Sequence, residues 1–433
     1  MKRLLLIFIV LFIGLVAYAE TLSSKAYSID EIPNVPDSLE YKAKSGDIFS
    51  QWLLGLNSYS RALSNNEPQY YQKAVYWFRK AAEQGNDSAQ VSLGRCYYYG
   101  DGVEQNYTEA VYWYRKAAEQ GNDSAQVSLG LCYYSGQGVE QNYTEAVYWF
   151  RKAVKGRDDE SLFFHQNDEA ECYLGICYEF GKGVEQNYTE AVNWYRRSAD
   201  GGNASAMCNL GVCYAFGKGV EQNYTEAVNW YRKAAEKDYA RGQWHLGVCY
   251  YTGRGVDKSY ADAVSWYQKA ADKEYAPAQT SLGICYEYGE GVERSYVDAV
   301  RWYRRSATQG NMYGQYNLGR SYEYGRGVNA NLVEAAAWYK KAAEQGHKAS
   351  QIKMAECYEQ GKGVKQDYIE SIKWYMKAAE QGDVDVQVKL GDIFYNGRGV
   401  AKNDTEAEKW YRMAAEKGNE KAKLALNNMG VIW

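Results

Sequence analysis

The chain has 433 residues and a formal net charge of −4 at pH 7, the wrong sign for attracting nucleic acid without regard to its sequence. Its composition is 46% hydrophobic and 24% charged, with only 4 Pro, which excludes a disordered chain and is compatible with helices. We therefore expect an ordered protein that has no nucleic-acid partner.

The first predicted element is an export signal. Lys2 and Arg3 precede an apolar run over residues 4–17, and Ala-Tyr-Ala at residues 17–19 has the small-x-small pattern of a cleavage site. The run is shorter than the ~20 residues that span a bilayer, and no later segment approaches that length. We expect cleavage after Ala19, no transmembrane segment in the mature chain, and a periplasmic or extracellular location, with a bacterial envelope favoured. An uncleaved membrane tether is the alternative.

After a lead-in over residues 20–44, one unit repeats through the chain. A Gly-x-Gly-Val motif and a Trp each recur every 36 residues, apart from one step of 45 that contains an insertion at about 156–169. This period predicts ten stacked repeats over residues 45–427, followed by a tail at 428–433. The final stretch NEKAKLALNN resembles an extra first helix, and its Lys421 and Lys423 suit a C-terminal cap.

Each repeat is predicted to hold two helices joined by a glycine turn. Residues 89–99 and 107–120 carry apolar side chains at helical spacing, and we call these segments helix A and helix B of their repeat. Gly100 and Gly102 can adopt positive φ at low cost, and the absence of a preceding strand and a third glycine argues against a phosphate loop. The predicted fold class is all-α, an α/α superhelical solenoid of about ten 36-residue helix-turn-helix repeats.

The stretch EQNYTEAV occurs four times without change, from residues 104, 140, 185 and 221. In the nine regular repeats the Asn106 position holds Asn, Ser or Asp, and Glu or Asp stands three residues later. These residues predict a capping box that starts helix B, with each cap contributing about 1 kcal/mol. Glycosylation of Asn-Tyr-Thr is an incidental alternative.

The unit A-x-x-x-L-G-x-x-Y-x-x-G-x-G-V, followed by A-x-x-W-Y-x-K-A-A-x-x-G, resembles the Sel1-like repeat, a relative of the tetratricopeptide repeat. The resemblance runs from about Ser45 to Asn427 and implies the α/α solenoid. It also implies a non-enzymatic adaptor that assembles protein complexes, on membranes in eukaryotes and in envelope or host-interaction settings in bacteria. It does not identify the partner.

A cysteine-rich branch of that family carries paired cysteines in each repeat and has been linked to penicillin binding or β-lactamase activity. Here seven of the nine cysteines occupy a single position per repeat: Cys96, Cys132, Cys177, Cys213, Cys249, Cys285 and Cys357. Equivalent positions in stacked helices lie roughly 8–10 Å apart, beyond disulfide reach, so we interpret these cysteines as buried packing residues. A disulfide from Cys208 to Cys177 or Cys172 is the alternative.

No catalytic or metal-binding pattern accompanies the repeats. The three His are scattered, and no His-x-x-x-His or Cys-x-x-Cys occurs, so we expect no metal, no cofactor and no small-molecule ligand. Ser350 and Lys353 match the S-x-x-K motif of penicillin-recognising enzymes, but no S-D-N or K-T-G motif accompanies them. We predict no enzyme activity. A secreted penicillin-binding or β-lactamase-like enzyme is the alternative, which a nitrocefin assay tests.

The predicted partner surface rests on helix A positions that differ between repeats. Counted from the Leu-Gly glycine, positions −5, −1, 0 and +3 are constant, whereas −3, +1, +4 and +5 vary and share one face, which is concave in tetratricopeptide repeats. We predict a groove for a protein or peptide, with an apolar floor in repeats three to seven and an acidic C-terminal stretch. Its residues are Leu131, Tyr134, Ile176, Phe180, Val212, Phe216, Trp244, Val248, Tyr251, Ile284, Glu287, Tyr288, Tyr316, Arg320, Glu323, Tyr324, Glu356 and Glu359.

Three alternatives remain for this surface. The side chains could pack against one another across a tightly wound superhelix. Charge reversal at Val212 and Val248 would distinguish this packing from a binding groove. A carbohydrate could stack on exposed Tyr and Trp, although most Trp occupy a constant position. The insertion, with Phe163 and Phe164 among charged residues, could reach a partner or fold back onto helix B.

Overall fold

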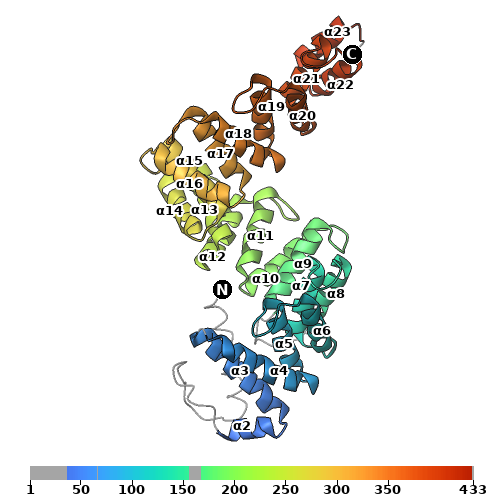
Figure 1. Ribbon diagram of the computed structural model, residues 1–433, viewed down its shortest axis with the longest axis vertical. Coiled ribbons are helices and arrows are strands. Elements are labelled where there is room, and N and C mark those ends of the chain that lie inside the picture. The colour runs from blue at the N-terminus through green and yellow to red at the C-terminus, as the bar shows by residue number, and fades with distance from the viewer. Residues whose placement is uncertain (1–36, 66, 156–166, 432–433) are drawn as a thin grey trace. The chain divides into compact units, whose positions relative to one another are not determined.

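The computed structural model describes residues 37–65, 67–155 and 167–431. These residues form 22 α-helices, α2 to α23, and no strand, which confirms the predicted all-α solenoid of about ten repeats (Figure 1). The predicted signal peptide, most of the lead-in and most of the insertion, including Phe163 and Phe164, lie outside the described residues. Among the described helices, none combines the length and apolar content that a membrane crossing requires.

The helices alternate between the two predicted types. The first repeat consists of α3 (Ile48–Asn65) and α4 (Pro68–Glu83), preceded by α2 (Asp37–Lys44), and the chain ends with the extra helix α23 (Glu420–Asn428). The A helices are α5 (Asp87–Tyr99), α7 (Asp123–Ser135), α9 (Asp168–Phe180), α11 (Ala204–Phe216), α13 (Ala240–Thr252), α15 (Ala276–Tyr288), α17 (Met312–Tyr324), α19 (Lys348–Gln360) and α21 (Val384–Asn396). The B helices are α6 (Tyr107–Glu119), α8 (Tyr143–Val154), α10 (Tyr188–Asp200), α12 (Tyr224–Glu236), α14 (Tyr260–Asp272), α16 (Tyr296–Thr308), α18 (Leu332–Glu344), α20 (Tyr368–Glu380) and α22 (Asp404–Glu416).

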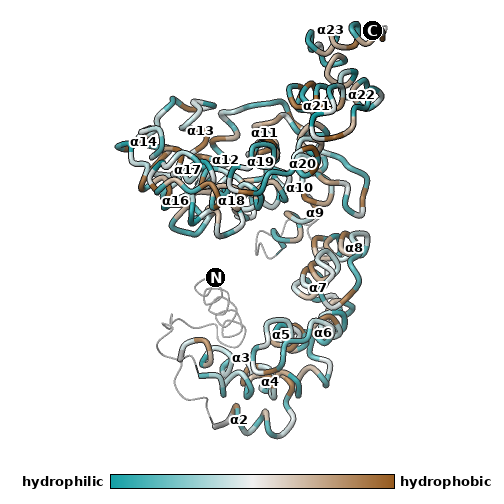
Figure 2. The backbone as a smooth tube through the Cα atoms, turned by 45° about the horizontal axis from the view of Figure 1, so that its top comes forward, coloured by the Kyte–Doolittle hydropathy of each residue, from teal (hydrophilic) through white to brown (hydrophobic). Residues whose placement is uncertain are grey.

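The helices form two compact units. Of the described residues, those up to 213 and those from 217 to 221 belong to unit 1, and residues 214–216 and 222–431 belong to unit 2. From α3 to α10 in unit 1 and from α12 to α22 in unit 2, helix A packs on helix B of its own repeat, and helix B packs on helix A of the next repeat. Figure 2 shows apolar residues along the helices and hydrophilic residues in the turns that join them.

The first two repeats complete their cores with a Trp from the repeat that follows. In unit 1, Trp149 of α8 packs in one cluster with Ala117 of α6 and Leu129 of α7. Gly130 of the Leu-Gly pair makes this packing dense, because a Cβ atom there would lie 2.6 Å from the ring of Phe150. No repeat therefore buries its apolar face alone, as expected for a solenoid.

The two glycines of the turn have different roles. Gly136 ends α7 in the left-handed conformation, with φ 73°. Gly138 also has a positive φ, 74°, and a Cβ atom there would clash with the carbonyl of Tyr107 at the start of α6 in the preceding repeat. The predicted hinge is confirmed, and its second glycine also permits close contact between repeats.

The recurring stretch EQNYTEAV starts helix B. The Asn106 side chain accepts hydrogen bonds from the backbone N–H groups of Thr108 and Glu109, at 3.0 and 3.1 Å. Equivalent caps start all nine regular B helices. The reciprocal bond of a capping box was the wrong expectation, because the Asn106 backbone N–H donates instead to the carbonyl of Tyr97 in helix A, at 2.9 Å. The cap thus also joins the two helices of its repeat.

The cysteines lie in the core. All seven of the single-position cysteines are buried and carry free thiols, which confirms them as packing residues. Burial raises the pKa of the Cys177 thiol to about 12, so this group is neutral and unreactive at ordinary pH. Cys172 and Cys208 are also buried, in α9 and α11.

Candidate binding surface on the A helices

The four variable positions of helix A differ sharply in exposure. Position +5, the last residue before the helix-ending glycine, carries five aromatic side chains that are 53% to 66% exposed. We call them the terminal aromatics: Tyr99 and Phe180 in unit 1, and Phe216, Tyr288 and Tyr324 in unit 2. Large exposed rings at the same position of several repeats are unusual. The repeats do not need these rings in order to stack.

The aliphatic +1 positions are half-buried. Leu131 packs against the unit 1 cluster that contains Phe150. Val248 packs against the unit 2 cluster of α14 and α15, and Ile284 packs against the cluster around Val300. Ile176 and Val212 have the same intermediate exposure. These side chains therefore contribute to stacking between repeats and leave only part of their surface to a partner.

Two predicted aromatics bond to the following repeat. The indole Nε1 of Trp244 donates to Ser281 Oγ at 3.0 Å, and the ring of Trp244 lies 6.0 Å from that of Tyr275. The ring of Tyr316 contacts His347 at 4.8 Å between centroids. Both aromatics are half-buried between repeats.

In five of the regular repeats, position +4 pairs with the middle residue of the Gly-x-Gly turn in the next repeat. The chemistry of the two partners changes together, so that a hydrogen bond or ion pair is preserved. The pairs are Tyr98 with Gln137 at 2.5 Å, Tyr134 with Lys182 at 2.9 Å, Glu179 with Lys218 at 3.1 Å, Tyr251 with Glu290 at 2.6 Å, and Glu287 with Arg326 at 3.0 Å. Variation at +4 thus reflects alternative solutions to one contact between repeats.

The carboxylates of the predicted acidic stretch are paired with tyrosine hydroxyl groups and with basic side chains. Glu287 is only 6% exposed, and it accepts hydrogen bonds from the hydroxyl of Tyr303 at 2.7 Å and from Arg326. Arg320, another predicted partner residue, lies 3.5 Å from the same carboxylate. Burial and the Glu287 charge raise the pKa of Tyr303, so that its hydroxyl remains a donor.

Glu323 and Glu359 repeat this arrangement. Glu323 accepts from Tyr339 at 2.5 Å and from Lys353 at 3.2 Å, and Glu356 lies 3.4 Å from the same lysine. Glu359 accepts from Tyr375 and Lys389 at 2.9 and 2.8 Å. Burial raises the pKa of Glu359, but these hydrogen bonds outweigh it and hold the pKa below its usual value. We call such sets Tyr–Glu–cation triads. Their cations neutralise the negative charge of the carboxylates that we predicted to line a binding groove.

Sequence reasoning missed the tyrosine and the cation of each triad. Unit 1 contains a further triad, in which Glu179 accepts from Tyr195 at 2.8 Å and from Lys218. The available signal was a Glu at +4 that is followed 16 residues later by Tyr and 30 or 39 residues later by Lys or Arg. The residue types at position +4 do not by themselves reveal this pairing.

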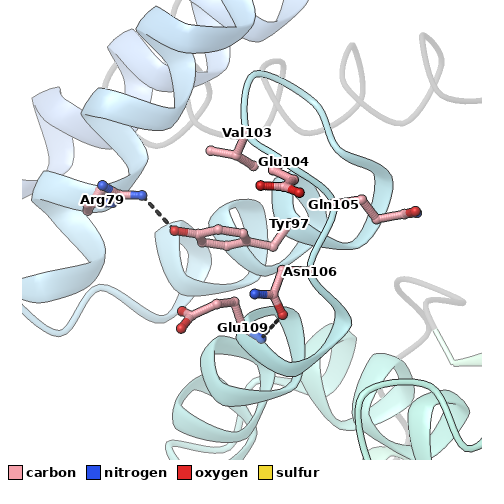
Figure 3. A pocket seen from close by; sticks show the side chains of 7 residues that line it. All are labelled: Arg79, Tyr97, Val103, Glu104, Gln105, Asn106 and Glu109. Atoms are coloured by element: carbon pink, nitrogen blue, oxygen red, sulfur yellow. Dashed lines mark hydrogen bonds between the residues drawn. The ribbon is translucent and has the colours of Figure 1, made fainter.

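A shallow cavity of about 580 Å³ lies on unit 1, away from the predicted residues. Its lining is polar and includes Arg79, Tyr97 and the turn Val103 to Asn106, with Glu109 beside it (Figure 3). Arg79 points across from α4 and donates to the Tyr97 hydroxyl at 2.6 Å. The same Arg–Tyr bond recurs in the next two repeats, so it links repeats.

The Ser and Lys of the S-x-x-K motif interact with other side chains and not with each other. Ser350 is fully buried, with its Oγ 2.8 Å from His347 Nδ1 at the start of α19. Lys353 bonds to Glu323 and Glu356, and these carboxylates raise its pKa against the opposing effect of burial, which leaves the amine protonated. In the described part of the chain, no group of three or more His, Cys, Asp or Glu is placed to hold a metal ion.

Known proteins share this architecture. The Sel1 repeat family profile matches ten times, at residues 49–86, 87–122, 123–158, 168–203, 204–239, 240–275, 276–311, 313–347, 348–383 and 384–419. No curated protein matches the chain in sequence. A crystal structure of a protective antigen present in uropathogenic Escherichia coli strains, with an SLR fold, is similar at 34% identity and TM-score 0.57, over 92% of this chain and 90% of that one. A Sel1 repeat protein from Oxalobacter formigenes is similar at 29% identity and TM-score 0.51, over 76% of this chain and 94% of that one. The ten matches and these two structures together show that the chain belongs to the Sel1 repeat family.

Proposed function

We propose that this Sel1 repeat scaffold is exported and binds a protein or peptide on the A-helix face, as an adaptor for complex assembly in an envelope or at a host surface. The terminal aromatics carry the proposal. Other large residues on the face are half-buried, whereas these five side chains are more than half exposed, including Tyr288 and Tyr324, whose hydroxyl groups also bond to Arg320 and Lys353 of the next repeat. Exposed aromatic rings of this kind are enriched where proteins bind one another.

The binding residues follow from this exposure. In unit 2, Phe216, Tyr288 and Tyr324 would make the main contacts, and half-buried aliphatic residues such as Val248 would line the floor between them. The carboxylates of the triads would act indirectly, because they hold adjacent repeats in register and have little free surface.

Two observations support export. The N-terminal sequence has the three parts of a secretory signal, and the similar Escherichia coli protein is described as a protective antigen, a property of proteins that a host encounters. N-terminal sequencing of protein from the envelope fraction tests this step. A mature chain that begins at residue 20 is expected, and an intact Met1 in a cytoplasmic fraction would refute it.

Photocrosslinking tests the surface itself. A photoreactive phenylalanine analogue at Phe216 or Tyr288, in native cells, should yield the same discrete crosslinked partner. The matched control is Val333, which is 65% exposed near the start of B helix α18 and should give no such product. Phe216→Ser should abolish the adduct formed at position 288 without changing the melting temperature. Equal crosslinking from position 333, or a large loss of stability in Phe216→Ser, would refute the proposal.

A further inference from the structure

The B helices of the first three repeats expose tyrosines that stacking does not require. Tyr76, Tyr112 and Tyr148 are 54%, 49% and 48% exposed, and each lies edge-on to the Trp that follows it, with ring centroids 5.0 to 5.1 Å apart. In the other seven repeats this position holds Asn, Ser, Arg, Ala or Lys, although those repeats stack in the same way. Stacking between repeats therefore does not require a tyrosine at this position.

A lysine accompanies each of these tyrosines. Lys80, Lys116 and Lys152 stand four residues later, with their Nζ atoms 6.0, 4.7 and 5.1 Å from the ring centroids of Tyr76, Tyr112 and Tyr148. Helices α4, α6 and α8 together contain seven Lys and Arg against four Glu, whereas the six B helices of unit 2 contain 12 against 13 acidic residues. This basic strip is distinctive in a chain whose net charge is −4.

The three helices lie next to one another. Trp113 of α6 packs in the cluster that contains Val75 and Phe78 of α4, and Trp149 of α8 packs in the cluster of α6 (Figure 1). Because each exposed Tyr directly precedes such a Trp or its equivalent, the Tyr–Lys pairs recur at one position of successive repeats. Unit 1 thus presents three chemically identical subsites in a line.

We propose that this Tyr–Lys strip, formed by Tyr76, Lys80, Tyr112, Lys116, Tyr148 and Lys152, binds a linear acidic polysaccharide. Identical subsites in a line match a ligand that is itself a chain of identical units, as a polysaccharide is. A half-exposed Tyr ring can pack against the apolar face of a sugar ring, while the adjacent ammonium pairs with a carboxylate. Three linked contacts raise affinity beyond that of one. The strip is separate from the A-helix face, so this proposal does not depend on the proposed function.

Binding of polygalacturonate, a linear polymer of uronic acid, tests the strip. Isothermal titration with oligomers of increasing length should show affinity that rises until the three subsites are spanned and then levels off, with the spanning oligomer about 100-fold tighter than monomeric galacturonate. Binding should weaken with added salt, and neutral dextran should not bind. No binding of polygalacturonate, or no dependence on length, would overturn the proposal.

Matched variants identify the surface. The triple variants Tyr76→Ser/Tyr112→Ser/Tyr148→Ser and Lys80→Gln/Lys116→Gln/Lys152→Gln should each weaken binding by about 10-fold or more while circular dichroism and melting temperature stay unchanged. The control is Lys233→Gln/Lys269→Gln/Lys341→Gln in unit 2, where each lysine lies 3.8 to 4.0 Å over a Trp ring without an exposed Tyr beside it. The control should retain full affinity.

Two further ligands decide between classes of partner. Equal affinity for poly-glutamate, with no effect of the Tyr variant, would reduce the strip to a general attraction for anions and refute the sugar contact. Stronger binding to vesicles of phosphatidylglycerol than to polygalacturonate would assign the strip to a membrane surface instead.

Discussion

Replacing Glu287 with alanine should destabilise unit 2 by about 2–4 kcal/mol. The largest part comes from Tyr303, which is fully buried and would lose the acceptor of its hydroxyl, at a cost of about 1–3 kcal/mol. Arg320 and Arg326 are 25% and 41% exposed, so water can replace the lost ion pairs and each adds about 0–1 kcal/mol. Glu287→Gln keeps an acceptor for Tyr303 and should cost roughly half as much.

Tyr303→Phe provides the second arm of a double-mutant cycle. Because the phenol and the carboxylate bond to each other, the double variant should be about 1–2 kcal/mol more stable than the sum of the single variants predicts. Urea unfolding followed by circular dichroism gives the totals, and hydrogen exchange in α15, α16 and α17 gives the local effect, since repeat arrays need not unfold in two states. The exposed Glu293 provides the control, Glu293→Ala, which should change nothing. A change below about 0.5 kcal/mol for Glu287→Ala, or additive effects, would refute a structural role for the triad.

Three further predictions concern the scaffold. Asn187→Ala should cost about 1 kcal/mol in thermal unfolding and Asn187→Asp almost nothing, since Asn187 caps α10; equal losses would contradict the cap. Gly138→Ala should lower the melting temperature clearly more than Gly121→Ala: both glycines have positive φ, which costs an alanine about 1–2 kcal/mol, but only at Gly138 would the added Cβ meet a neighbouring backbone. Burial raises the pKa of Cys177 and Cys213 from 9.0 to about 12, so the stability that the neutral thiols provide is complete below pH 9 and falls as the pH rises toward 12; native protein at pH 8 should resist alkylation, and denatured, unreduced protein should yield nine thiols. Rapid labelling of native protein, or fewer than nine thiols, would show this interpretation to be wrong.

Local backbone chemistry could be predicted from the sequence. The positions of the helix-ending glycines, the caps such as Asn106 and the buried cysteines follow from the period and from what each residue type does within a few residues of itself. The one local error, the reciprocal capping bond, arose because the N–H of Asn106 has a competing acceptor in Tyr97, which belongs to the other helix. The competing group is nine residues away in sequence and becomes a neighbour only once the turn has formed.

The candidate surface was harder to predict, for a physical reason. Variation between repeats was interpreted as freedom from packing, and this interpretation fits Phe180 and Phe216, which are exposed. It does not fit Glu287, whose partners lie 16 and 39 residues further along and supply the charge that makes its burial tolerable. A helix A position that holds Tyr in one repeat and Glu in another can still be needed for packing, because what must be preserved is its contact with a partner residue and not the residue type itself.

The pairing of position +4 with the Gly-x-Gly turn of the next repeat limits how such a gene can lengthen or shorten. Recombination between repeats joins the +4 residue of one copy to the turn of another. A junction that brought Glu179 opposite Glu290 in place of Lys218 would set two carboxylates against each other at a contact that now holds an ion pair. A junction that brought Glu179 opposite Arg326 would preserve the ion pair. Viable copy-number variants should therefore be those whose new junction conserves charge complementarity, however similar the duplicated blocks are in the rest of their sequence.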